Sequence, residues 1–452
     1  MYKFKTEQVL DPQFLTKLVD LFLNREVKKY KKLERYYRVK NDILARQMES
    51  GKPNNKLAHS FCRYISNMAT SYFLGKPVQY TVETAEYREA LEKTYKKNYI
   101  DSLNFELSKE ASKKGISFEI IFVDENGKLE EQKLNAEEVL PVYSPVLGEF
   151  LECAIRIWSD YDIDGVLKKQ SAEVYTKQEI ITYEREAVGA LFHMVDSRTH
   201  HFSDVPVIVV WNNEEVMGDY EPVISSVDAY DKAMSDTAND SEYFSDAYLC
   251  IVGAGGGLED GTATTADEED PDRAAYTLRK NRLLLLDEKG QAQWLTKNTN
   301  DVAQENYKSR LRNDIFFLSQ VPALSDESFA GNLTGVAIKY KLIGLEELTI
   351  MKESKFEAAL QKRDKLVTEY LNMTMNQRWN PEEIEHKFER NFIENDSDLI
   401  EDAANLEGIV SKRTQLKKLP SSVVENIDEE LEQIEAEKLK DENLRMVKEY
   451  EV

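Results

Sequence analysis

The sequence predicts an α+β fold in which helical segments enclose a β-rich middle. Apolar residues recur at helical spacing over residues 1–48. Residues 115–215 instead hold short β-branched and aromatic runs separated by turn residues. No proline occurs between Pro322 and Pro381, where apolar residues again recur at helical spacing, which predicts a long helix. The strand spacing indicates an antiparallel sheet beside the helices.

The N-terminal elements carry clear boundary signals. Asp11 and Pro12 are typical of a helix cap followed by a first-turn proline. A second amphipathic helix over residues 57–73 ends at Gly75. A short strand, Val78 to Val82, and a helix over about residues 84–113 follow. Strands are then expected at 117–124, 136–143, 151–158, 172–175, 179–183 and 206–211, with a hairpin turn at 125–127.

A polar helix opens at Pro222 and runs to about Asp246. Its narrow apolar stripe comprises Val223, Val227, Tyr230 and Met234. A helix this polar cannot lie in an apolar core. We therefore expect it to be exposed, or to pack against copies of itself through small polar contacts. Residues 247–300 form a small αβ insert with strands near 248–252, 283–286 and 293–295, and a second helix covers 301–320.

The C-terminal part consists of a loop, a long helix and an acidic module. A polar, glycine-containing loop covers residues 325–335, and the long helix after it contains Gly344, where a bend costs little. Residues 380–452 are expected to be helical, with 21 acidic and 10 basic residues.

Charge excludes several classes of function. The formal net charge is −24, and the segment 258–272 alone holds seven acidic residues and no basic one. An acidic chain is a poor nonspecific ligand for DNA phosphates. Eight basic residues lie between Arg25 and Lys40, which we interpret as a subunit or capsid contact face. No apolar run is long enough to cross a membrane.

The sequence lacks the usual motifs of an enzyme. It holds no phosphate-binding loop of the GxxxxGK[ST] type, and acidic residues follow the glycine cluster 253–257. The three cysteines, Cys62, Cys153 and Cys250, form no CxxC pair, which indicates a reducing compartment. We interpret His193, His200 and His201 as part of a polar loop rather than a metal site, and we expect no cofactor.

Two groups of motifs carry a resemblance to a known family. The first group is Asn54-Asn-Lys-Leu-Ala-His59 with Tyr72-Phe-Leu-Gly-Lys-Pro-Val-Gln-Tyr80. The second is Asn313-Asp-Ile-Phe-Phe-Leu-Ser-Gln-Val-Pro322, followed by Ser325-Asp-Glu-Ser-Phe-Ala-Gly-Asn332 and Gly335-Val-Ala-Ile-Lys-Tyr-Lys341. In this order and spacing the chain resembles the portal (connector) proteins of long-tailed bacteriophages, in the group common in Gram-positive hosts.

The resemblance implies a portal-type fold and a ring, about twelve copies around a central channel. Its domains would be a wing (1–220), stem helix 1 (221–246), a clip (247–300), stem helix 2 (301–320), a tunnel loop (321–335), a long wing helix (336–378) and an acidic helical crown (379–452). The ring would lie at one capsid vertex of the virion, and in the host cytoplasm during assembly. Its partners would be the terminase, a head–tail adaptor, the major capsid and scaffolding proteins, and double-stranded DNA bound without sequence preference.

Two sets of residues are the expected functional sites. The DNA-channel tunnel loop would comprise Ser325, Asp326, Glu327, Ser328, Phe329, Ala330, Gly331 and Asn332. The clip loop that docks partners would comprise Glu259, Asp260, Asp267, Glu268, Glu269, Asp270 and Asp272.

Two other functions compete with the portal interpretation. The acidic cluster 267–272 with the basic helix suggests a metal-dependent nuclease, although adjacent acids beside Gly- and Thr-rich sequence are more typical of a solvated loop. The chain could also be another head-completion protein of the virion. The portal interpretation, with no enzyme activity, is the one we expect.

Overall fold

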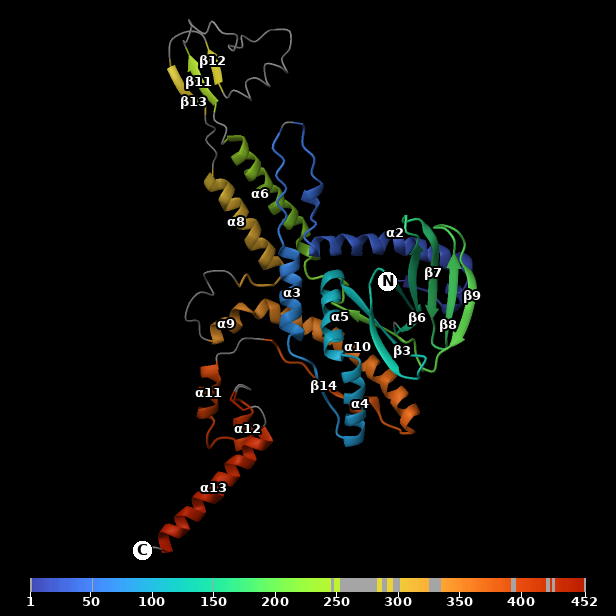
Figure 1. The fold of residues 1–452 in the computed structure, drawn as a ribbon, viewed down its shortest axis with the longest axis vertical. Coiled ribbons are helices and arrows are strands. Elements are labelled where there is room, and N and C mark those ends of the chain that lie inside the picture. The colour runs from blue at the N-terminus through green and yellow to red at the C-terminus, as the bar shows by residue number, and fades with distance from the viewer. Residues whose placement is uncertain are drawn as a thin grey trace. The chain divides into compact units, whose positions relative to one another are not determined.

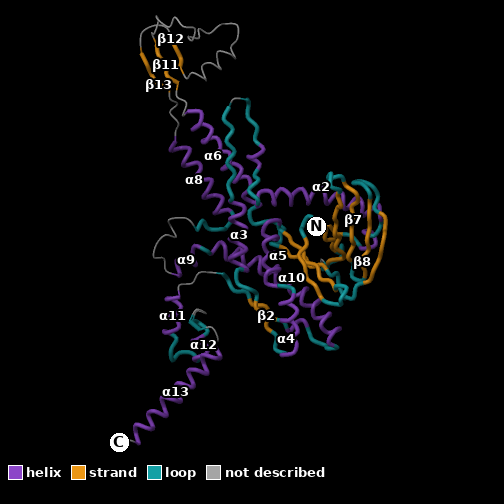
Figure 2. Tube along the Cα trace, viewed as in Figure 1, coloured by secondary structure: helices purple, strands orange, loops and turns teal. Residues whose placement is uncertain are grey.

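The computed structural model describes residues 2–50, 52–148, 150–244, 248–252, 283–286, 291–295, 301–324, 335–391, 396–419, 423–424 and 427–450 (Figure 1). The chain divides into two compact units. The first comprises Met1–Val321 and Leu348–Glu389, and the second comprises Pro322–Glu347 and Arg390–Val452. Helices and strands are mixed along the chain (Figure 2), which confirms the expected α+β class.

Five helices begin the first unit, namely α1 (Thr6–Val9), α2 (Pro12–Tyr37), α3 (Phe61–Leu74), α4 (Ala85–Lys97) and α5 (Ile100–Lys114). The predicted cap is confirmed, because the Asp11 carboxylate accepts a hydrogen bond from the Phe14 N–H. The single helix expected over 84–113 is wrong. Tyr99, with a φ of 51°, interrupts it in a left-handed conformation that a helix cannot continue through.

A six-stranded sheet has the order β1-β5-β6-β7-β8-β9. Its strands are β1 (Tyr2–Lys3), β5 (Val139–Tyr143), β6 (Leu151–Tyr161), β7 (Leu167–Tyr175), β8 (Glu179–Arg185) and β9 (His193–Thr199). Within this six-stranded sheet, the β1–β5 pair is parallel and the other four pairs are antiparallel. The polar loop expected around His193 is wrong, because this residue opens β9. Every residue of that edge strand is exposed, so no apolar alternation marks it.

A second sheet has the order β10-β3-β4, so the predicted single sheet is in fact two. Its strands are β3 (Ile116–Val123), β4 (Leu129–Leu134) and β10 (Val207–Trp211). The expected hairpin turn joins β3 to β4 and has Gly127 at a φ of 74°. One apolar core lies between α2 and the two sheets, and another joins α3, α4, α5 and α10 (Ile343–Met375).

Two helices and three short strands follow the sheets. The helix α6 (Ile224–Phe244) leads to β11 (Tyr248–Val252), β12 (Leu283–Leu286) and β13 (Gln291–Leu295), which pair in the order β12-β11-β13. The helix α8 (Asp301–Leu318) then returns beside α6 (Figure 1). These elements agree with the helices and strands expected there from the sequence.

The long C-terminal helix is divided. α9 (Gly335–Lys341) and α10 are separated at Leu342, two residues before the bend expected at Gly344. The helical expectation for 380–452 is wrong at its start. Glu385–Lys387 form β14, which pairs with β2 (Gln79–Thr81) in the first unit. Sequence alone could not show this pairing, because the two strands are about 300 residues apart.

The second unit contains α9, α11 (Asp396–Asn405), α12 (Lys412–Leu416) and α13 (Ile427–Tyr450). Inside it, the Arg390 guanidinium donates to both carboxylate oxygens of Glu346 at 3.0–3.1 Å. The α12 N-terminus is capped by Ser411, whose hydroxyl accepts from the Thr414 N–H.

Candidate functional site

Both sets of residues expected to act directly fall outside the described part of the chain. The tunnel-loop residues Ser325–Asn332 lie in the gap between residues 324 and 335. The clip-loop residues Glu259–Asp272 lie in the gap between residues 252 and 283. The described elements next to the clip-loop gap are β11 and β12, and those next to the tunnel-loop gap are α8 and α9. The helices α6 and α8 lead into and out of β11–β13, so the candidate site is built from these two helices and their attachment to the first unit.

Residues 41–50 run out along one face of α6, with a short 3-10 helix at Asp42–Ala45, and residues 52–59 run back (Figure 1). We name this segment, residues 41–59, the stem strap. Asp231 of α6 is fully buried and accepts from the Asn41 side chain at 2.5 Å and from the His59 N–H at 3.0 Å. The His59 Nδ1 lies 2.7 Å from the same carboxylate. Asp231 therefore holds both ends of the strap.

Further side chains of α6 continue this attachment toward the far end of the helix. The Ser235 hydroxyl accepts from the Leu57 N–H at 2.9 Å, and the Asp236 carboxylate pairs with Arg46 at 2.5 Å. The side chain of Asn239 accepts from the Asn55 N–H at 2.6 Å. These positions lie on one side of the helix, because residues three and four apart share a face.

The strap explains why α6 is polar. From the sequence alone, such a helix is either exposed or packed against copies of itself. Its polar side chains instead hydrogen-bond the stem strap of the same chain. Residues 52–59 belong to no helix or sheet, and the short carboxylate, amide and hydroxyl side chains of α6 accept from the backbone N–H groups of Asn55, Leu57 and His59.

The helix α8 covers the opposite side of α6. The Thr237 hydroxyl lies 3.4 Å from the Gln304 side-chain oxygen. Thr237 is two residues from Ser235, whose hydroxyl bonds the strap at Leu57. At about 100° per residue, this places Thr237 about 160° around the helix from Ser235. The stem thus has three layers in the order strap, α6, α8.

Aromatic side chains support the last turns of α8. The Phe316 ring meets Phe61 and Tyr64 of α3 edge-to-face, at centroid distances of 5.7 and 5.6 Å. Tyr230 of α6 meets Phe61 in the same way at 5.1 Å. The motif 54–59 and the helix after it therefore contact both stem helices, which assigns a structural role to residues that the sequence marked only by resemblance.

A buried polar cluster fixes the base of the stem. Asp219, just before α6, accepts from Ser112 of α5 at 2.5 Å and from Asn212 at 2.8 Å. It also forms an ion pair with Lys352 of α10. One carboxylate thus joins α5, the end of β10 and α10 to the start of the stem.

The chain also makes a close backbone approach at this base. Gly115 has a φ of 85°, and a Cβ atom there would lie 2.3 Å from the Val216 carbonyl oxygen. A Cβ atom on Gly218 would lie 2.5 Å from the Lys113 carbonyl oxygen. Only glycine fits both places, so the end of α5 and the loop before α6 touch through their backbones.

A second buried network joins α10 to the smaller sheet. The Arg363 guanidinium donates to Glu119 at 2.7–3.1 Å and to Asn104 at 2.6 Å. Burial, together with the neighbouring Glu119 carboxylate, holds the pKa of Glu131 well above its usual range. Two carboxylates thus share one guanidinium, and the repulsion between two buried negative charges favours the neutral form of Glu131.

His386 ties β14 to α10 in the same region. Its Nδ1 lies 2.9 Å from Glu357 and its Nε2 lies 2.7 Å from Asp364. Burial lowers the pKa of His386, but the two carboxylates outweigh this effect and raise the pKa above its ordinary value. The Phe388 ring stacks on Phe73 at 5.5 Å and completes the attachment.

The basic residues of α2 are only partly paired within the chain. Lys29 forms an ion pair with Glu221 at 2.8 Å, and Arg38 forms one with Glu34 at 2.7 Å. Lys28, Lys31 and Lys32 are exposed. The contact role expected for Arg25–Lys40 stays a prediction.

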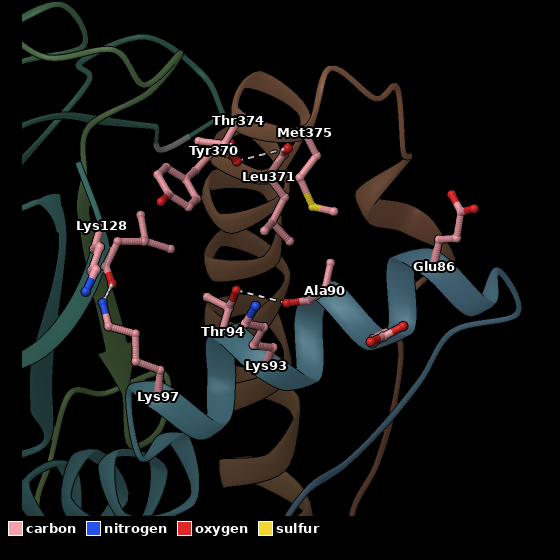
Figure 3. A pocket seen from close by; sticks show the side chains of 12 residues that line it. Glu86, Ala90, Lys93, Thr94, Lys97, Lys128, Tyr370, Leu371, Thr374 and Met375 are labelled. Atoms are coloured by element: carbon pink, nitrogen blue, oxygen red, sulfur yellow. Dashed lines mark hydrogen bonds between the residues drawn. The ribbon is translucent and has the colours of Figure 1, made fainter. Parts of the chain in front are cut away.

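A groove of about 610 Å³ lies between α4, the last turns of α10 and the start of β4 (Figure 3). Its lining includes the apolar side chains of Ala90, Leu129, Tyr370, Leu371 and Met375, with Lys93, Lys97, Lys128, Glu86 and Glu89 around them. The Lys97 ammonium group already pairs with Glu130 at 2.7 Å. No histidine, cysteine or serine lines this groove.

The described residues contain neither a metal-binding cluster nor a membrane-spanning helix. In that part of the chain, no group of three His, Cys, Asp or Glu side chains is arranged to hold a metal ion. No described helix is long and apolar enough to span a bilayer.

The comparisons with known proteins agree on one family. Residues 23–443 match the family model described as phage portal protein, SPP1 Gp6-like. The portal protein of Bacillus phage SPP1 is 27% identical over 431 residues, which cover 89% of this chain and 82% of that protein. The portal protein of Clostridium phage phiCD119 is 24% identical and covers 85% of this chain and 87% of its own length.

One solved structure is also similar. It is the neck of an empty GTA particle computed with C6 symmetry, at 15% identity and a TM-score of 0.42, covering 80% of this chain and 90% of that chain.

The sequence matches define a class first, that of phage structural proteins that are components of the virion. More narrowly, this chain belongs to the family of SPP1 Gp6-like phage portal proteins. Its function is that of a phage portal, as the resemblance of the motifs in 54–80 and 313–341 predicted.

Proposed function

We propose that copies of this chain close into a ring of about twelve subunits, with the α6–α8 stems side by side around a channel for double-stranded DNA. A closed ring requires two different surfaces of the subunit to meet head-to-tail. The supporting observation is the three-layered stem, which leaves two different outer faces on opposite sides of α6. A rigid base at Asp219 suits a stem that must keep its position in a ring.

The parts of the chain take the following roles in this proposal. Residues 1–220 form the wing, 221–246 and 301–320 the stem, 247–300 the clip, 321–335 the tunnel loop, 336–378 the long wing helix and 379–452 the crown. The start of the crown is the one boundary that we propose to move. The β14 pairing and the His386 contacts attach residues 385–389 to the first unit rather than to the helices after them.

The clip is proposed to bind the terminase during packaging and the head–tail adaptor afterwards. Its acidic loop 258–272 holds seven acidic residues and offers a charged docking surface. Deleting 258–272 from the full chain should leave ring assembly intact and weaken binding to both partners. Loss of the ring in this variant would instead make the loop part of the ring structure.

DNA is proposed to pass without sequence readout and without chemistry. The net charge of −24 disfavours adhesion of DNA phosphates to the wall. Incubating the purified ring with duplex DNA and Mg²⁺ or Mn²⁺ should therefore produce no cleavage. Metal-dependent cleavage that is lost on removal of 267–272 would support the nuclease alternative.

Native mass spectrometry and electron microscopy of the purified chain test the central proposal. The expected result is a closed ring with a central hole. A monomer that persists at high protein concentration would contradict it. The same images count the subunits directly.

A further inference from the structure

The outer faces of the three-layered stem carry apolar side chains that nothing in the described part of the subunit covers. On α8, Tyr307 is 54% exposed and Phe317 is 81% exposed. On the strap, Leu57 is 38% exposed, and Leu44 and Met48 are also exposed. Exposed apolar patches of this kind are typical of surfaces that bind another protein.

These side chains belong to two defined faces. The α8 outer face comprises Tyr307, Arg310, Asp314, Phe317 and Leu318, which share one side of the helix at spacings of three, four, three and one. Its polar centre is an exposed ion pair between Arg310 and Asp314. The strap outer face comprises Leu44, Met48 and Leu57.

The strap and α8 lie on opposite sides of α6. The strap hydrogen-bonds the side of α6 that carries Asp231 and Ser235, whereas Gln304 of α8 approaches Thr237, about 160° around the helix from Ser235. Because α6 lies between them, the strap and α8 cannot cover each other within one subunit. Two different faces on opposite sides are what a head-to-tail contact needs.

Apolar residues also occur at the same level along the stem on both faces. The Leu57 N–H donates to the Ser235 hydroxyl, so Leu57 lies at the level of Ser235 along α6. Thr237 is opposite Gln304, and α8 returns antiparallel to α6, so Tyr307 lies within about one turn of the level of Ser235. Phe317 lies ten residues further along α8, about 15 Å away.

We propose that the strap outer face of one subunit packs on the α8 outer face of the next, with Leu57 beside Tyr307. The occupant of each face is thus a second copy of this chain. The inference rests on the proposed ring, because rotation about a ring axis parallel to the stem brings equal levels of neighbouring stems together. It assigns the interface to named residues that the family relationship does not identify.

Cysteine cross-linking tests the contact. In the full chain with Cys250→Ser, the pair Leu57→Cys and Tyr307→Cys should form intersubunit disulfides on mild oxidation. Denaturing gels without reductant should then show a ladder up to the full ring. Either single variant should remain monomeric on the gel, because a head-to-tail contact never brings identical residues together.

The matched control pairs Leu57→Cys with Phe317→Cys. A disulfide needs Cα atoms within about 7 Å, so an offset of about 15 Å should leave this pair uncross-linked. Rings without a Leu57–Tyr307 ladder, or with equal cross-linking in both pairs, would overturn the proposed contact while leaving the portal function intact. Absence of any ring would instead overturn the proposed function itself.

Charge substitution provides a second readout. Leu57→Glu and Tyr307→Lys should each lower the fraction of chains in rings at least tenfold. The double variant should recover most of the ring fraction, because the two new side chains carry opposite charges. Both side chains are exposed in the single subunit, so the melting temperature of the monomer should stay within about 2 °C. Single variants that assemble normally, or a double variant that recovers nothing, would contradict the contact.

Discussion

The ammonium group of Lys352 and the carboxylate of Asp219 form a buried ion pair, with side chains that are 3% and 0% exposed. The first residue lies on α10 and the second at the base of the stem, 133 residues away in the chain. The carboxylate also accepts from Ser112 and Asn212. This one group therefore connects the long helix to the stem, and changes here should affect both.

Replacement of Lys352 by Met should leave Asp219 charged and without its cation. Breaking a buried pair from one side costs about 3–5 kcal/mol. Urea denaturation should show a loss of this size in the free energy of unfolding. The double variant Lys352→Met with Asp219→Asn should lose less, because no unpaired charge remains.

A suitable control is Lys365→Met. Lys365 is 45% exposed and lies 3.8 Å from Asp204, and an exposed pair of this kind contributes about 0–1 kcal/mol. Equal effects of the two lysine variants would contradict the role given to the Asp219 cluster.

His386 should make stability depend on pH. The carboxylates of Asp364 and Glu357 contact its two ring nitrogens, the Tyr95 hydroxyl also donates to Asp364, and the Tyr80 ring packs against the imidazole. Its pKa is raised in the folded chain. The stabilisation by the imidazolium is therefore complete below the ordinary value of about 6.5 and is lost as the pH rises through the folded value.

The difference in melting temperature between the parent chain and His386→Gln, measured from pH 5 to 9, tests this dependence. The difference should be largest at low pH and should shrink as the pH rises. A difference that grows with pH would mean that His386 is neutral in the folded chain.

Asp231→Ala should release the stem strap. The substitution removes the acceptor of the Asn41 and His59 hydrogen bonds and leaves buried donors unsatisfied, at about 1–3 kcal/mol each. Limited trypsin digestion should then cut faster after Arg46, Lys52 or Lys56. The exposed neighbour Lys232→Ala should leave the digestion rate unchanged, and equal rates in both variants would refute the attachment.

Gly115→Ala should be far more harmful than Gly127→Ala. Both glycines have a positive φ, which costs an L residue about 1–2 kcal/mol. Only at Gly115 would the new methyl group also meet a carbonyl oxygen, that of Val216 at 2.3 Å. The difference between the two losses in unfolding free energy isolates the close backbone approach, and similar losses would mean that the stem base can relax.

Gly331→Val should stiffen the tunnel loop. The position lies between a segment ended by Pro322 and the helix α9, and a β-branched residue removes the backbone freedom that glycine supplies. Rings should still form, and packaging or retention of DNA should fall. Normal packaging by rings that carry this substitution would contradict a moving contact between the loop and DNA.

Local patterns were sufficient for most helices and strands. Apolar spacing identified α2, α3 and α6, and turn residues identified the β3–β4 hairpin, because these signals lie within a few residues of each other. The failures have local causes. β9 is exposed on both faces and so carries no alternation, and the break at Tyr99 depends on one backbone angle that no pattern encodes.

By itself, the sequence determined that this chain is an α+β protein of the portal family and that α6 cannot lie in an apolar core. Only the tertiary structure decided what satisfies that polar helix. Asp231 bonds Asn41 and His59, which are 190 and 172 residues away. A hydrogen bond between such distant residues leaves no period in the sequence, because either partner alone looks like an ordinary solvated side chain.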